Sequence, residues 1–142
     1  MSNGFSLNVN GTKLNVQEGM EIKSQPKETQ KVLSIFDTNH NGVLDSHDAI
    51  GGISEAKLYR SGVFKVTSQE VNYKVNNENG NLKYEANWKL DEDNRIINYT
   101  EDYNGDGEID VVRTIRYDSH GNVLEDEFYE NEDYYGQWTS QD

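Results

Sequence analysis

The sequence contains no cysteine and no long apolar segment. Without cysteine, the chain forms no disulfide framework and offers no thiolate to a metal ion. Residues 1–20 are polar and lack the apolar centre of a secretory leader. No stretch approaches the roughly 18 consecutive apolar residues of a membrane span, so we expect no membrane insertion.

The sequence also lacks the local motifs of the common enzyme classes. There is no glycine-rich phosphate loop before a helix, no His-Glu-x-x-His pair and no serine in a nucleophile elbow. Acidic pairs are abundant, but none is singled out as a general acid and base. We therefore expect a protein that is not an enzyme, and a catalytic acidic cleft is left as an alternative.

Positive charge is scarce in the C-terminal third. The net charge is -13; residues 1–90 hold ten basic and ten acidic side chains, whereas residues 91–142 hold three basic and sixteen acidic ones. The whole imbalance thus lies after residue 90. Such a surface disfavours nucleic acid and anionic membranes and favours cations or a basic partner.

The composition still predicts a folded chain. Hydrophobic residues make up only 33% and the mean hydropathy is -0.94, yet aromatic residues reach 11%. Disordered acidic chains are poor in aromatics, so we expect a folded protein with a thin core that bound metal could stabilise.

The first 61 residues predict a hairpin and two helices. Phe5, Leu7 and Val9 alternate before an Asn10-Gly11 turn, which is typical of a hairpin over residues 4–22. Residues 24–36 predict a helix that Ser24 caps, and residues 46–59 predict a second helix after a twelve-residue loop.

The remaining residues predict strands joined by short turns, the clearest over residues 82–90. We expect the aromatic side chains here to pack in the core or across strands; they are Trp88, Tyr99, Tyr117, Phe128 and Tyr129. The predicted fold class is α+β, with a small helix-loop-helix unit over residues 1–61 and an acidic antiparallel β-meander over residues 62–142.

Residues 37–48 have the spacing of a calcium-binding loop. Oxygen-bearing side chains occupy its first, third, fifth, ninth and twelfth positions, a glycine lies at the sixth and an apolar residue at the eighth. The alternative is a degenerate loop that keeps its shape without metal. The predicted ligands are Asp37, Asn39, Asn41, the Val43 carbonyl, Asp45 and Asp48.

Residues 102–110 repeat the first nine positions of this pattern. The twelfth position is Arg113, which cannot bind a cation, and the residues after the loop predict a strand, so Glu101 or a neighbouring strand would have to complete the site. The alternative is an acidic turn whose composition serves only turn geometry. The predicted ligands are Asp102, Asn104, Asp106, the Glu108 carbonyl and Asp110.

The stretch from Ser24 to Tyr59 resembles an EF-hand, and its loop resembles those of bacterial EF-hand-like and dockerin-type proteins. Residues 102–110 are similar to the Asp-x-Asn-x-Asp-Gly loops of bacterial surface proteins. The resemblance implies calcium as the bound ion and does not specify a biological role.

Together these patterns predict a non-catalytic protein that Ca²⁺ stabilises, at the cell surface or outside the cell, with a cytoplasmic location left open. Two alternatives remain. One is a calcium sensor, although its helices hold few Met or Phe for an apolar groove. The other is an adhesin or glycan-binding module that uses Tyr134, Tyr135 and Trp138, and a protein or glycan partner is left open.

Overall fold

The computed structural model of the chain describes residues 5–38, 40–44 and 55–130. Ten strands hold half of these residues, and one α-helix, α1 (Lys27–Phe36), and a short 3-10 helix, η1 (Lys57–Tyr59), accompany them. The strands are β1 (Phe5–Val9), β2 (Thr12–Val16), β3 (Met20–Glu21), β4 (Val43–Leu44), β5 (Val63–Thr67), β6 (Glu70–Asn76), β7 (Leu82–Leu90), β8 (Ile96–Asp102), β9 (Val111–Tyr117) and β10 (Val123–Glu130).

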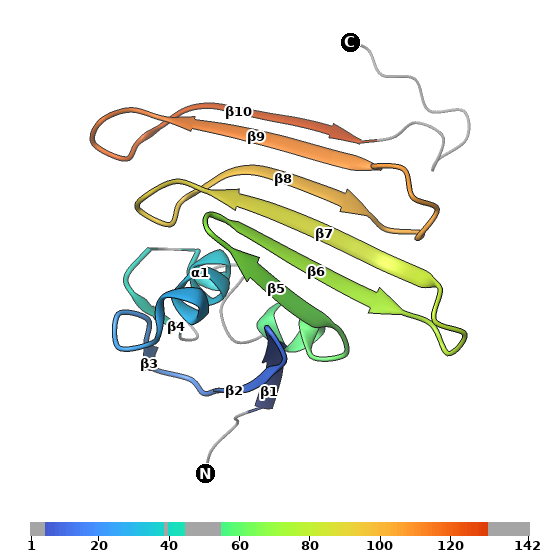
Figure 1. Cartoon of the computed structure of the whole chain (residues 1–142). Coiled ribbons are helices and arrows are strands. Elements are labelled where there is room, and N and C mark those ends of the chain that lie inside the picture. The colour runs from blue at the N-terminus through green and yellow to red at the C-terminus, as the bar shows by residue number, and fades with distance from the viewer. Residues whose placement is uncertain (1–4, 39, 45–54, 131–142) are drawn as a thin grey trace.

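Eight strands form one mixed sheet in the order β10-β9-β8-β7-β6-β5-β1-β2. Strands β5 to β10 follow one another as antiparallel hairpins and lie side by side in Figure 1. The N-terminal hairpin joins this sheet because β1 pairs in parallel with β5. Strands β3 and β4 form a separate two-stranded sheet.

The predicted α+β class is therefore wrong: the described chain is mostly β, not a helix-loop-helix unit joined to a meander. The strands after residue 62 were expected from their alternation, but their union with β1 was not. The edges of β1 and β5 both carry backbone groups that need hydrogen-bond partners, and pairing satisfies both. Asn10 strengthens the junction: its N–H donates to the Phe64 carbonyl at 2.8 Å and its side-chain oxygen accepts from the Val66 N–H at 2.7 Å.

Helix α1 covers one face of the sheet near β5 (Figure 1). Its Leu33 and Phe36 are fully buried, and the Phe36 ring meets that of Phe64 edge-on at 6.4 Å. Burial alternates along β5, β6 and β7, as expected for strands with one covered face. Residues from both predicted domains share this core, and the boundary at residue 61 stays a prediction.

The helical predictions need two corrections. Helix α1 begins at Lys27, not Ser24; Pro26 precedes it, and the Ser24 hydroxyl instead donates to the Glu21 carbonyl at 3.0 Å. Most of the predicted second helix, residues 46–54, lies outside the described residues. At its end, Glu55 and Ala56 are helical and η1 comes next.

Three hairpin turns of the sheet are built alike. In each, one side-chain oxygen of the first residue accepts from the N–H groups two and four residues later, at 2.8–3.1 Å. The residue between those two donors has a positive φ, which explains a glycine or asparagine there. The first residues are Asn77, Asp91 and Asp118. These hydrogen bonds lower the pKa of the Asp118 carboxyl and mark residues 118–122 as a hairpin turn.

Candidate metal centre

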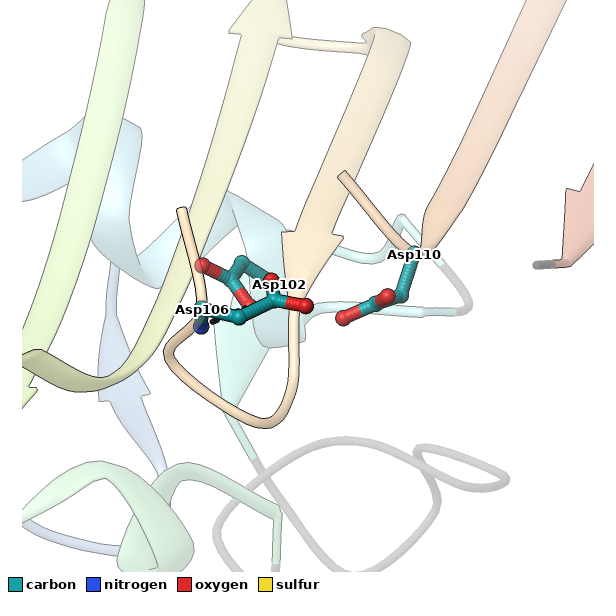
Figure 2. Close-up of side chains that lie close together, drawn as sticks. All are labelled: Asp102, Asp106 and Asp110. Carbon is teal, nitrogen blue, oxygen red and sulfur yellow. Dashed lines mark hydrogen bonds between the residues drawn. The ribbon is translucent and has the colours of Figure 1, made fainter. Parts of the chain in front are cut away.

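The hairpin between β8 and β9 brings three carboxylates together. Asp102 ends β8, Asp110 directly precedes β9, and Asp106 lies in the loop between them. One carboxylate oxygen of each lies within 4.8 Å of the others (Figure 2). Asp102 and Asp110 are each only 3% exposed, whereas Asp106 is exposed. A hard cation at this point could be bound from both strands and from the loop.

Backbone N–H groups hold the Asp102 carboxylate in place. One of its oxygens accepts from Gly105 at 2.8 Å and from Asp106 at 3.3 Å, and the other accepts from Gly107 at 2.8 Å. Such hydrogen bonds fix the orientation of a carboxylate. Asp102 is therefore positioned by the loop that it begins.

Asp110 and the other loop side chains are also positioned by backbone groups. The Asp110 carboxylate accepts from the Tyr103 N–H at 3.0 Å, and the Asp110 N–H donates to the Glu101 carbonyl at 2.7 Å. The Asn104 side-chain oxygen accepts from the Asp106 N–H at 3.2 Å, and Asp106 accepts from the Glu108 N–H at 2.9 Å. The roles predicted for Asn104 and the Glu108 carbonyl as ligands stay predictions.

Close contact with β7 fixes the position of this loop. Gly105 has a φ of +74°, and a Cβ at this position would meet the Leu82 carbonyl and lie 2.9 Å from the Lys83 Cα. Only glycine fits both the backbone conformation and the space. The loop is therefore packed against the neighbouring hairpin.

The loop that begins at Asp37 shares two of the hydrogen bonds that hold the Asp102 carboxylate. Asp37 is 5% exposed and directly succeeds α1; its carboxylate accepts from the Asn41 N–H at 3.3 Å and from the Gly42 N–H at 2.8 Å. In the Asp102 loop, the equivalent N–H groups belong to Asp106 and Gly107. They lie 3.3 and 2.8 Å from the oxygens of the Asp102 carboxylate.

The backbone matches as well. The fourth and sixth positions of both loops have positive φ, with His40 at +57° and Gly42 at +83° in one, and Gly105 at +74° and Gly107 at +89° in the other. Two loops with different flanking elements thus adopt one local conformation around their first aspartate.

The two loops lead into different elements. In the first, Val43 and Leu44 form β4, which pairs with β3, and Leu44 is fully buried as the predicted apolar plug. In the second, Ile109 at the same position is 48% exposed. Three predicted ligands of the first loop lie outside the described residues; they are Asn39, Asp45 and Asp48.

Glu101 does not complete the Asp102 site. Successive side chains of a strand point to opposite faces, so Glu101 and Asp102 diverge. The Glu101 carboxylate instead accepts a short hydrogen bond from the Tyr84 hydroxyl. Arg113 makes two hydrogen bonds with Asp126, at 2.9 and 2.7 Å, which agrees with its exclusion as a ligand.

Sequence reasoning missed a group of tyrosines around Glu101. Burial raises the pKa of the hydroxyls of Tyr59, Tyr84 and Tyr99 well above the usual range. Burial also raises the pKa of Glu55, and the negative charge of the Glu55 carboxylate further raises the pKa of Tyr59. The alternation of β7 and β8 could have placed Tyr84 and Tyr99 on one face, but nothing local in the sequence brings Tyr59 to them.

Not all predicted aromatic packing is found. Trp88 and Tyr99 pack together with ring centroids 5.3 Å apart, whereas Phe128 and Tyr129 are 58% and 65% exposed. Tyr134, Tyr135 and Trp138 lie outside the described residues.

No protein-family model, curated protein or solved structure matches the chain. The resemblance to EF-hand-like and dockerin-type loops therefore stays a prediction. Among the described residues, no helix is both long enough and apolar enough to cross a membrane.

Proposed function

We propose that the protein binds calcium and that the ion closes the end of the β8–β9 hairpin. The observation that carries this proposal is the convergence of Asp102, Asp106 and Asp110 within 4.8 Å. Without a cation, three carboxylates at this distance repel one another; with one, they become ligands joining two strands. The role is structural and not catalytic.

The donor set favours calcium over other ions. All candidate ligands are oxygens, which suit hard cations, and the chain has no cysteine for a softer metal. A loop that mixes carboxylate, amide and carbonyl oxygens suits Ca²⁺ better than Mg²⁺, which requires a near-ideal octahedron. The Asp37 loop, with the same arrangement around its first carboxylate, is proposed as a second site.

The expected stabilisation is modest. For a dissociation constant near 10⁻⁴ M and about 1 mM free calcium, one site would add about 1.4 kcal/mol to the free energy of unfolding. Such a contribution is useful to a protein with a thin core. It also favours an environment with millimolar calcium, such as the cell surface or the extracellular medium.

Isothermal titration of the chelator-treated protein tests the proposal, with magnesium titrated in parallel. We expect two saturable calcium events; Asp106→Ala should remove one and Asp37→Ala the other. Glu108→Ala is the matched control, because it removes one charge from the same loop and leaves the three converging carboxylates intact. Absence of calcium binding up to millimolar concentration, or equal losses in Asp106→Ala and Glu108→Ala, would contradict the proposal for the β8–β9 loop.

A further inference from the structure

Strand β10 is an open edge of the large sheet. It stands at one end of the strand order, and among the described residues only β9 pairs with it. Seven of its eight residues are exposed. Its large exposed apolar side chains, 55–65% accessible, are Val123, Leu124, Phe128 and Tyr129.

The opposite edge of the sheet is different. Strand β2 has five residues, ends in the fully buried Val16 and carries none of the large exposed apolar side chains in the described part of the chain. Long edge strands with exposed apolar side chains are templates for an additional strand. β10 therefore has the features of a docking edge, and β2 does not.

Charge indicates which kind of segment β10 would bind. Half of its residues are acidic, and the excess charge of the whole chain lies after residue 90. Glu125 and Asp126 already face Arg116 and Arg113 of β9, at 2.8 and 2.7 Å. Carboxylates on an edge discourage pairing between like chains, but they leave the exposure of Phe128 and Tyr129 unexplained.

A second copy of this chain fits the edge poorly. In an antiparallel pair of β10 strands, residues on the same face stand opposite each other. Centring the pair on Asp126 sets Asp126 against Asp126, centring it on Glu127 sets Glu127 against Glu127, and centring it on Phe128 sets Asp126 against Glu130. Every one of these registers places carboxylates directly opposite carboxylates, which is destabilising.

We infer that β10 binds an extended basic segment of a partner protein, which adds to the sheet beside it. Glu125, Glu127 and Tyr129 alternate along one face of β10, so two Lys or Arg residues at alternate positions of the partner would face carboxylates. On the other face, Phe128 borders a hollow of about 360 Å³ that is lined by Tyr99, Arg113, Asp126 and Phe128 itself. An apolar side chain of the partner would enter it.

A fluorescein-labelled peptide of eight alternating Lys and Val residues is a suitable probe, with a Glu-Val peptide as its counterpart. Anisotropy titrations are run in saturating calcium and repeated in chelator. Comparing the two conditions distinguishes peptide binding at β10 from electrostatic attraction to the aspartate loops. We expect the Lys-Val peptide to bind in both conditions and the Glu-Val peptide to bind in neither. Glu127→Lys should raise the dissociation constant about three- to tenfold, as expected for reversing one surface charge pair.

Glu78→Lys is the matched control. Glu78 is exposed in the turn between β6 and β7, so this variant changes net charge equally and leaves β10 intact. Hydrogen exchange of the unmodified chain gives a second readout, in which the peptide should protect the amides of residues 123–130. Equal weakening by both variants, or no protection of these amides, would overturn the inference.

Two other results would also overturn it. Reversible dimers of the unmodified chain in sedimentation, with the amides of residues 123–130 protected from exchange in the dimer, would make a second copy the occupant of this edge. Binding that arises only after deletion of residues 131–142 would assign the edge to the chain's own C-terminal segment.

Discussion

The two aspartate loops hold their first carboxylate alike, but in different surroundings. Asp37 succeeds a helix and Asp102 ends a strand, yet each accepts from the N–H groups four and five residues later at the same pair of distances. The first loop continues into a short strand with a buried Leu44, and the second into the long strand β9. The local conformation therefore depends on the loop sequence, not on flanking helices.

The described residues show how the second loop is completed. In the Asp102 loop, the hairpin itself returns Asp110 to the first carboxylate, and β7 packs against Gly105. In the calcium site that we propose, the hairpin would take the place of the second helix of a helix-loop-helix unit. This comparison makes position-specific predictions for the two loops.

Exchanging the residues at the fourth loop position should have the largest effect. Gly105→His introduces a side chain at positive φ against the β7 backbone, so we expect a loss of about 2–4 kcal/mol in the free energy of unfolding. The reciprocal His40→Gly, at an exposed position, should change it by about 0.5 kcal/mol or less. Urea unfolding in chelator measures both. Similar small changes in the two variants would show that β7 does not constrain the Asp102 loop.

Removing the first aspartate should destabilise both loops even without calcium. Asp102→Ala deprives the Gly105 and Gly107 N–H groups of their acceptor, and Asp37→Ala does the same to Gly42. These hydrogen bonds are part-buried, so the loss of each should cost about 0.5–1.5 kcal/mol. The exposed Asp106→Ala serves as the control and should cost less. If Asp102→Ala has the wild-type free energy of unfolding in chelator, then the hydrogen bonds to the Asp102 carboxylate do not organise the loop.

The twelfth position should matter least in the hairpin loop. Arg113 is half-exposed and pairs with Asp126 of β10, so Arg113→Gln should change calcium affinity less than about twofold and stability by about 1 kcal/mol or less. In the Asp37 loop, by contrast, Asp48→Asn should weaken calcium binding, because Asp48 is a predicted ligand. Calcium titrations of both variants test these two expectations. A large change of affinity in Arg113→Gln would contradict the hairpin-closure account.

Local patterns predicted much of this molecule. Alternation predicts a strand over residues 82–90 with both ends correct, and loop spacing predicts Asp102, Asp106 and Asp110 as neighbours, which the structure brings together. Pairing of β1 with β5 joins segments more than 50 residues apart, and periodicity does not report which edges meet. The helix start was misplaced because Ser24 bonds Glu21 instead of capping.

The alternation of side chains along a strand could have predicted the orientation of Glu101. That prediction requires knowing that β8 ends at Asp102. Adjacent residues of a strand point to opposite faces, which sends Glu101 towards Tyr84. Burial of Tyr59 against Phe36 and Trp88 depends on tertiary packing that no short window of sequence contains. The conformation of the loops could thus be predicted from local sequence, whereas the elements that pack around them could not.

The most direct test monitors the amide resonances of Gly42 and Gly107 by ¹⁵N NMR while calcium is added to the chelator-treated protein. Each N–H donates to the first carboxylate of its own loop, so the two signals report the two sites separately. The account predicts that both signals shift saturably with calcium and that Asp106→Ala abolishes the shift of Gly107 alone. An unchanged Gly107 signal at millimolar calcium would contradict the proposal that the β8–β9 hairpin is closed by this ion.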